Sequence, residues 1–212
     1  MTEKILVLCD DIYHPKQVTQ KGLAGLKEFG YQFDWIVDAN EFLTEWMVAY
    51  PVVILSKMNH ISSSDETPWI TETVQRAFLD YVKNGNGLLV LHSGTVGYEQ
   101  AFVLRALMAG VFREHPDQCP VTVEPTADHP LTEGSENFTL VDEHYFMDMD
   151  DNQVEIFINT SSEHGTQPGG WCRREGNGRV CVLTPGHNLE VWQHPSYQIL
   201  LHNALRWCSQ II

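Results

Sequence analysis

The chain has 212 residues, with 13 Lys and Arg against 28 Asp and Glu, a formal net charge of −15 and 43% hydrophobic residues. So much apolar material with only 19% charged residues excludes intrinsic disorder, and the length suits a single globular domain over 1–212. The negative charge and the lack of a Lys/Arg cluster argue against nucleic acid as a partner. No stretch reaches the roughly 20 apolar residues of a membrane helix, so we expect a cytoplasmic protein without a membrane partner.

The first half of the sequence alternates strand and helix patterns. Apolar runs predict strands at 5–9, 33–37, 52–56 and 88–92. A helix is predicted at 16–29, and a clearer one shares an apolar face over 70–82, with Thr67-Pro68 as its start and Asn84-Gly85 as its stop. Because the runs at 5–8 and 88–91 are apolar at every position, they indicate strands buried on both faces of a largely parallel sheet.

The second half is predicted to be β-rich, with short strands at 120–124, 138–141, 154–159 and 179–183, and a last helix starting near Pro195. The five Cys residues show no CxxC spacing and mostly lie in apolar stretches. We therefore expect buried reduced thiols rather than disulfides or metal ligands.

Polar side chains follow several of the predicted strands, and in open parallel sheets ligands bind beyond the carboxyl ends of the strands. The candidates for substrate binding from this pattern are Asn59, Ser93, Gly94 and Thr95. The turn at Ser93 resembles a nucleophile elbow, but Leu91 stands where the first Gly of G-x-S-x-G should be. His92 at the end of its strand is either a core histidine or an acid–base group.

The chain has ten His residues, and most lie beside Gly, Pro or an acidic residue, as is typical of loops. Imidazole and carboxylate groups could bind a divalent metal such as zinc, with His14, His115 and His164 as candidate ligands. Without an HExxH motif, such a site must be assembled from distant loops. The alternative is that several of these His residues cap turns.

Residues 142–145 are interpreted as a strand, in which Glu143 and Tyr145 share one face. Glu143 is then a general base beside a hydroxyl donor, or else a surface charge. Trp171 and Trp192 flank loops rich in Gly and His. They either form aromatic platforms for a sugar or pack in the core.

Five segments in this order resemble the trehalose-utilisation (ThuA-like) family, which has the fold of the class I glutamine amidotransferase-like superfamily. The segments are 87–95, 109–116, His129-Pro130, 142–145 and 178–187. The resemblance runs nearly end to end and implies a three-layer α/β/α flavodoxin-like fold with a role in sugar metabolism. True amidotransferases carry a Cys at the elbow, whereas this chain reads Leu91-His92-Ser93, so thiolate glutaminase chemistry is excluded.

The leading hypothesis is a hydrolase or lyase that uses acid–base catalysis, with a divalent metal where one binds, on a small sugar or an oxidised disaccharide. Glu143 is assigned as base, His92 and His187 as proton donors or metal ligands, Tyr145 as hydroxyl donor, and Arg179 as a group that orients substrate or Glu143. The alternative is a non-catalytic sugar or effector-binding module, and a third hypothesis is a structural oligomer component. Homo-oligomerisation is expected only as a general tendency of such proteins.

Overall fold

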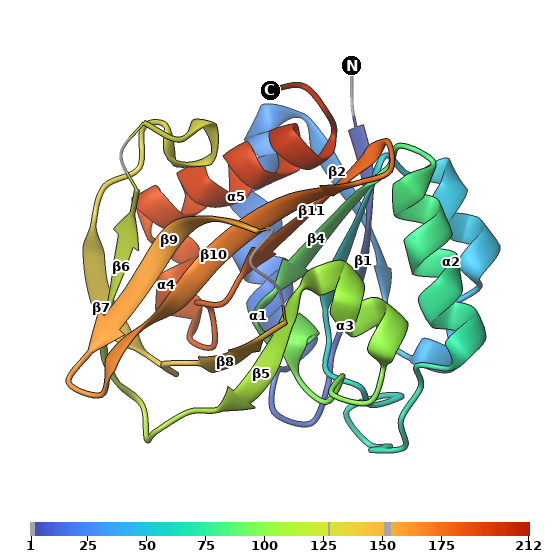
Figure 1. Cartoon of the computed structure of the whole chain (residues 1–212), viewed down its shortest axis with the longest axis horizontal. Coiled ribbons are helices and arrows are strands. Elements are labelled where there is room, and N and C mark those ends of the chain that lie inside the picture. The colour runs from blue at the N-terminus through green and yellow to red at the C-terminus, as the bar shows by residue number, and fades with distance from the viewer. Residues whose placement is uncertain (1–2, 127, 151–153) are drawn as a thin grey trace.

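The computed structural model describes residues 3–126, 128–150 and 154–212. Within these ranges, one sheet has the strand order β2-β1-β3-β4-β11-β10-β9-β6-β7 (Figure 1). In that order the strands are β2 (Tyr31–Ile36), β1 (Glu3–Cys9), β3 (Val52–Ser56), β4 (Gly87–Leu91), β11 (Gly178–Leu183), β10 (Gly165–Glu175), β9 (Glu155–Ser162), β6 (Cys119–Pro125) and β7 (Phe138–Asp142). A small second sheet pairs β5 (Gly110–Glu114) with β8 (Phe146–Met149).

The strands from β2 to β11 run parallel, since β1 pairs in parallel with β2 and β3, β3 with β4, and β4 with β11. Every residue of β3, β4 and β11 is buried, as strands covered on both faces require. The four strands predicted in the first half of the sequence are therefore confirmed to within two residues at each end. Their carboxyl ends all lie at one edge of the sheet.

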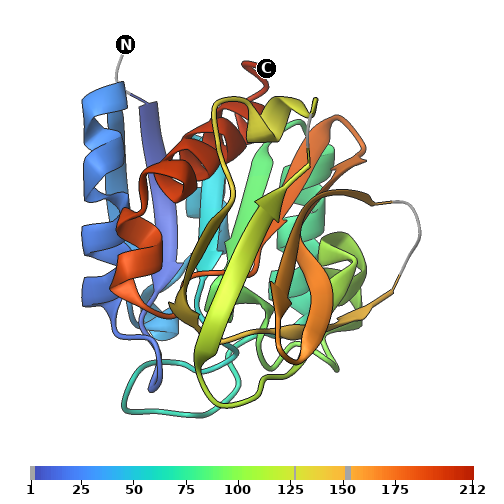
Figure 2. The ribbon, with the colours of Figure 1, turned by 90° about the vertical axis from the view of Figure 1, so that its left-hand side faces the viewer.

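Helices cover both faces of the sheet (Figures 1 and 2). On one face, α1 (Lys16–Leu23), α4 (Leu189–Gln193) and α5 (Pro195–Cys208) share an apolar core with the strands. On the other face, α2 (Glu72–Lys83) and α3 (Phe102–Met108) complete a second core. The predicted three-layer α/β/α fold is confirmed.

Two helix predictions need correction. The cap of α2 is Thr71, whose hydroxyl accepts from the N–H of Val74 at 3.3 Å, and not Thr67-Pro68. The backbone N–H groups of Trp69 and Ile70 instead bond to the side chain of Asn59, which keeps this segment out of the helix. The helix predicted at 16–29 ends at Leu23 and continues as the 3-10 helix η1 (Ala24–Phe29).

The second half of the sheet is antiparallel, from β11 through β10, β9 and β6 to β7, and its β7 end faces the viewer in Figure 2. The expected β-rich second half is thus confirmed. The sequence did not predict β10, because the breakers Pro168, Gly169 and Gly170 interrupt its pattern and produce shifts in its pairing with β9. The short elements α3, β5 and β8 also escaped prediction.

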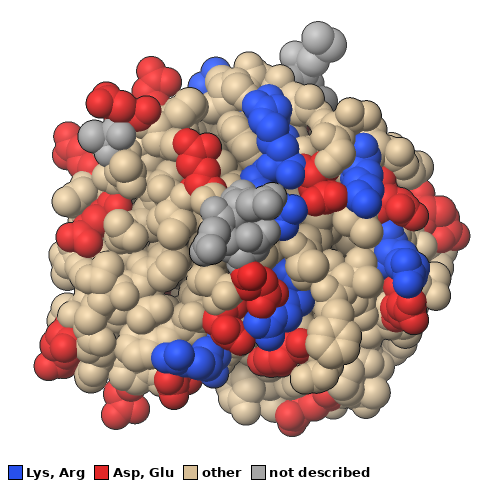
Figure 3. Space-filling view, in the orientation of Figure 1, with Lys and Arg blue, Asp and Glu red and all other residues tan. Residues whose placement is uncertain are grey.

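All five Cys residues are buried and free, as expected. In the described part of the chain, no helix combines the length and apolar character needed to cross a membrane. On the face in Figure 3, Lys and Arg side chains lie among Asp and Glu side chains.

Candidate active site

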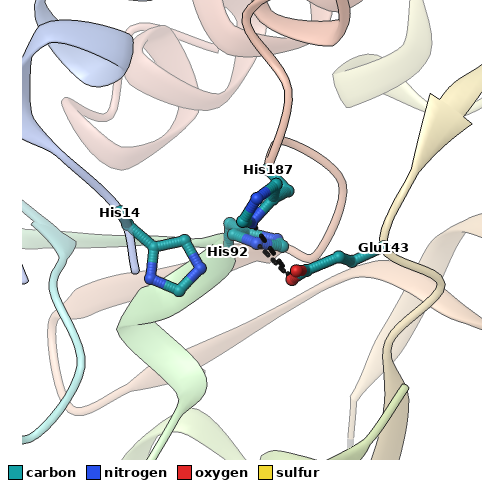
Figure 4. Close-up of side chains that lie close together, drawn as sticks. All are labelled: His14, His92, Glu143 and His187. Carbon is teal, nitrogen blue, oxygen red and sulfur yellow. Dashed lines mark ion pairs between the residues drawn. The ribbon is translucent and has the colours of Figure 1, made fainter. Parts of the chain in front are cut away.

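Four ligand-type side chains from distant parts of the sequence meet at the carboxyl edge of the sheet (Figure 4). His14 lies after β1, His92 directly after β4, Glu143 directly after β7 and His187 after β11. One nitrogen or oxygen atom from each lies within 4.8 Å of the corresponding atom of every other. The expected assembly of imidazole and carboxylate groups at one edge of the sheet is therefore present.

His14 is held by the buried carboxylate of Asp11. The Asp11 Oδ1 atom lies 2.7 Å from Nδ1 of His14 and also accepts from the backbone N–H groups of Tyr13 and His14. Its Oδ2 accepts from the N–H of Met58 at 3.1 Å, which joins the loops after β1 and β3. Burial raises the pKa of Asp11, but these hydrogen bonds outweigh burial and hold it below its ordinary value. Asp11 thus binds Nδ1 of His14 and leaves Nε2 directed into the site.

Burial lowers the pKa of His14 itself, because desolvation and the neighbouring His92 and His187 outweigh the contribution of Asp11. His14 is therefore neutral at neutral pH. Its Nε2 lies 3.5 Å from the hydroxyl of Tyr145.

His92 occupies the sharp turn after β4, with φ of 42°. A non-glycine residue pays a conformational cost in this left-handed region, and such strain is found where function requires it. Its Nδ1 donates to the carbonyl of Thr184 at 2.7 Å, and its ring stacks on Tyr145 with centroids 4.1 Å apart. With Nδ1 bound to Thr184, Nε2 of His92 faces the Glu143 carboxylate.

The elbow therefore presents His92 and not Ser93. Ser93 is buried, and among the described residues its hydroxyl has no hydrogen-bond partner. Gly94 permits the close approach expected of it, since a Cβ there would lie 2.1 Å from the carbonyl oxygen of Leu55. The hydroxyl of Thr95 donates to the carbonyl of His92 and helps to fix the turn.

His187 is positioned by Asp142, a buried carboxylate at the end of β7. Asp142 accepts from the backbone N–H groups of Gly186, His187 and Asn188 at 2.8, 2.9 and 3.1 Å. Trp192 also donates to the carbonyl of Gly186, at 2.6 Å. The loop after β11 is thus fixed from both sides, and Nδ1 of His187 lies 3.2 Å from Oε2 of Glu143.

Glu143 is the centre of the charge distribution at the site. Its Oε2 lies 3.4 Å from Nε2 of His92, and its Oε1 lies 3.7 Å from Nε2 of His115. Burial raises the pKa of Glu143, but His187 and His92 outweigh burial and hold it well below its ordinary value. The Glu143 carboxylate in turn raises the pKa of His187. Glu143 is therefore an anion at neutral pH.

Within the described residues, Nε2 of His92 and Nδ1 of His187 are buried and make no hydrogen bond of good geometry. Their partner is the Glu143 carboxylate, whose Oε2 lies 3.4 Å from the first nitrogen and 3.2 Å from the second. Histidines that bind metals usually offer one nitrogen to the ion and donate from the other. His14 and His92 follow this pattern, because Asp11 and Thr184 occupy their Nδ1 atoms. The donor set suits zinc, which prefers nitrogen and oxygen ligands in tetrahedral geometry.

The cluster borders a pocket of about 600 Å³. Its lining consists of Ile12, Tyr13, His14, Met58, Val96, Phe112, His115, Glu143, Tyr145 and His187. His115 donates from Nδ1 to the carbonyl of Pro116 at 2.7 Å, which leaves its Nε2 toward Glu143. Burial and the neighbouring Glu143 raise the pKa of Tyr145 well above its ordinary value, so its hydroxyl stays protonated.

Several residues predicted for substrate binding lie elsewhere. Arg179 starts β11 beside Gly87, at the opposite edge of the sheet from Glu143, and it donates to the carbonyls of Trp207 and Ile212. The expected contact between Arg179 and Glu143 is therefore wrong. Asn59 uses its amide to bond three backbone groups, at Gly97, Trp69 and Ile70, and it does not line the pocket.

The two predicted aromatic platforms are core residues. Trp171 and Trp192 are 0% and 1% exposed, and their Nε1 atoms donate to the carbonyls of Met108 and Gly186. The core alternative thus describes both Trp residues.

His164, a predicted metal ligand, lies in the turn between β9 and β10, where its Nε2 is 3.8 Å from the carboxylate of Glu163. It is not part of the cluster.

The expectation that 142–145 forms a strand was wrong beyond Asp142, where β7 ends. Glu143 and Tyr145 nevertheless both line the pocket, whereas His144 turns away to Ser162 and Thr160. Sequence reasoning missed the supporting roles of Asp11 and Asp142. Both gave a positional signal, since Asp11 is the second residue after the strand predicted at 5–9 and Asp142 is the first after the strand predicted at 138–141.

A second group of ligand types, His129, Glu155 and Cys172, lies apart from this pocket. Nδ1 of His129 accepts from the N–H of Leu131 at 3.1 Å, so the proton of the neutral ring is on Nε2, which faces Glu155 at 3.2 Å. Burial raises the pKa of Cys172 to about 12. With no free ring nitrogen and a protonated thiol, this group is poorly prepared to bind a metal.

Comparisons with known proteins agree with this architecture. Residues 4–208 match the trehalose-utilisation (ThuA) family. A ThuA-like protein from Bacteroides uniformis superposes with a TM-score of 0.75 at 22% identity, covering 97% of this chain and 91% of that one. A ThuA-like protein from Parabacteroides merdae gives 0.76 at 19% identity, covering 99% and 90%.

A glutamine amidotransferase from Thermotoga maritima gives a TM-score of 0.61 at 12% identity and covers 99% of each chain, which shows the shared fold. No curated protein matches the sequence. Because the family match spans nearly the whole sequence, the chain belongs to the trehalose-utilisation (ThuA) family.

Proposed function

We propose that this carbohydrate-related protein is a hydrolase or lyase that acts on a small sugar or an oxidised disaccharide by metal-assisted acid–base chemistry. The observation that carries the proposal is the cluster of three His side chains and one carboxylate, from His14, His92, His187 and Glu143, whose ligand atoms lie within 4.8 Å of one another. Residues from four strand ends are held in this arrangement by buried hydrogen bonds. Such preorganisation is characteristic of catalytic and metal sites.

His14, His92 and His187 would hold a zinc ion through one nitrogen each, with Glu143 beside them. A bound zinc ion would supply a Lewis acid that polarises a carbonyl or lowers the pKa of a water molecule. Glu143 is ionised and can accept a proton from the substrate or from water, and binding of His92 and His187 to the ion would remove the contacts that lower its pKa and so make it a stronger base. Nε2 of His115 lies 3.7 Å from Oε1 of Glu143 and would pass the proton from Glu143 to solvent. The protonated hydroxyl of Tyr145 would donate a hydrogen bond to a substrate oxygen.

The side chains that line the pocket favour a sugar without a charged group as its ligand. Among the described residues that line it, none is Lys or Arg, the side chains that recognise phosphate and carboxylate groups. Its polar groups can instead bond hydroxyls, and its apolar side chains can contact the C–H surface of a sugar ring.

The test combines metal analysis with turnover. Calorimetric titration of chelator-treated protein should give one zinc ion per chain, and replacement of His14, His92 or His187 by Ala should each abolish that binding. Glu143→Gln should lower turnover of trehalose or its oxidised derivative by about 10²- to 10⁴-fold without loss of the fold. Glu163→Gln is the matched control, because Glu163 is exposed in the turn between β9 and β10.

Unchanged turnover in folded Glu143→Gln would refute the role of the base. Sugar binding without any product, with or without zinc, would instead favour a non-catalytic sugar-binding module.

A further inference from the structure

We infer that Tyr13 is the surface on which the pocket stacks the apolar face of a sugar ring, which makes it a determinant of substrate affinity. The inference rests on the proposed function and names the residue that selects for a sugar at the same site. It replaces Trp171 and Trp192, whose rings are buried in the core.

Tyr13 combines a position in the pocket lining with an exposed ring. Tyr13 lines the pocket, yet it is 62% exposed, and its neighbour Ile12 is 43% exposed. Contiguous exposed apolar surface, such as that of the neighbours Ile12 and Tyr13, marks a binding site where it lines a pocket. Tyr13 contributes little to the core, so its ring is available to a ligand.

The backbone at Tyr13 is nevertheless fixed in place. Asp11 accepts from the N–H of Tyr13 at 3.1 Å and from the N–H of His14 at 3.0 Å, and the same carboxylate orients the His14 ring. One short turn therefore sets the position of both the aromatic side chain and a proposed metal ligand. A platform on such a turn loses little backbone freedom when a ligand binds.

The pocket also has the two kinds of surface that a sugar needs. The polar side chains of His115 and Glu143 can bond hydroxyls, whereas Tyr13 and Phe112 supply aromatic surface. Phe112 is held against Tyr145 with ring centroids 4.4 Å apart. A pyranose ring offers a C–H patch to an aromatic face while its hydroxyls point outward to polar partners.

The experiment measures binding of trehalose and of trehalose with one hydroxyl oxidised to a carbonyl, by calorimetry with zinc-loaded protein. Steady-state kinetics on the same sugars separate affinity from chemistry. Tyr13→Ala should raise Kd and KM by about tenfold, the factor given by about 1.4 kcal/mol, while kcat changes by less than about threefold. Tyr13→Phe keeps the ring and should stay within about threefold of the wild type.

Phe102→Ala is the matched control, since Phe102 is 69% exposed and lies outside the pocket. Equal affinities of wild type and Tyr13→Ala for a sugar that the wild type binds would overturn the inference and leave the proposed function standing. Conversion of a wild-type dimer to a monomer by Tyr13→Ala, with unchanged sugar affinity, would assign the exposed ring to a second copy and would also overturn it. If the wild type binds neither sugar, the proposed function fails, and the inference fails with it.

Discussion

Replacing Asp142 by Asn tests how the loop that carries His187 is held. The Asp142 carboxylate accepts three backbone N–H groups, from Gly186, His187 and Asn188, at 2.8 to 3.1 Å. Asn has nearly the same volume, but its amide oxygen cannot serve all three donors, and its NH₂ group faces one of them. Burial raises the pKa of Asp142, opposed by His92 and by these N–H donors, so the site is a costly place for an unmatched polar group.

The magnitude follows from the burial of the three donors. The N–H of Gly186 is fully buried and costs about 1 to 3 kcal/mol when left without an acceptor, and the two part-buried N–H groups add roughly 1 kcal/mol together because water can reach them. We therefore expect Asp142→Asn to lower the free energy of unfolding by about 2 to 4 kcal/mol. Release of His187 should also weaken zinc binding by about 10- to 100-fold.

Urea unfolding in the presence of chelator measures the first effect, and calorimetric zinc titration of the folded variant measures the second. Asp38→Asn is the control, because Asp38 makes a single exposed bond to the N–H of Asn40 and should change stability by less than about 0.5 kcal/mol. A variant with normal stability and normal zinc affinity would refute the positioning role of Asp142.

Three other substitutions probe separate parts of the account. In metal-free protein, Glu143 raises the pKa of His187, so the stabilisation by this pair is complete below about pH 6.5 and is lost as the pH rises through the raised folded-state pKa. The difference in unfolding free energy between wild type and His187→Gln should thus be larger at pH 6 than at pH 9, and equal differences would contradict the pairing. Gly22→Ala places a Cβ 2.5 Å from the ring of Trp192 and should cost about 1 to 3 kcal/mol by urea unfolding; no loss would mean that this contact relaxes freely. Arg179→Ala removes a hydrogen bond to the carbonyl of Trp207 and should lower stability by about 1 to 3 kcal/mol, whereas a specific loss of sugar turnover would restore Arg179 to the site.

The central sheet could be predicted from the sequence because buried parallel strands leave an unambiguous apolar pattern. The same pattern located the site, since residues directly after a strand must lie at its carboxyl end. His14 and His92 were found in this way. Arg179 fails the same rule, because it lies at the start of β11 and so at the opposite edge.

Local patterns could not resolve which side chains face the pocket in irregular segments. Glu143 and Tyr145 were paired by strand periodicity, but they lie in the connection between β7 and β8, where periodicity does not apply. For Trp171 and Trp192 the sequence left sugar platforms and core packing open, and close packing decides for the core: a Cβ on Gly22 or Gly186 would crowd the ring of Trp192. Contacts between residues far apart in the sequence determine whether such side chains face the pocket or the core, and local sequence patterns do not predict those contacts.

Anomalous diffraction at the zinc absorption edge, on crystals of the protein grown with one equivalent of zinc, tests the central claim most directly. We expect one strong peak bounded by Nε2 of His14, Nε2 of His92 and Nδ1 of His187, with Glu143 beside it. A peak at His129, Glu155 and Cys172 instead, or no peak at the strand-end cluster, would contradict the metal-assisted account.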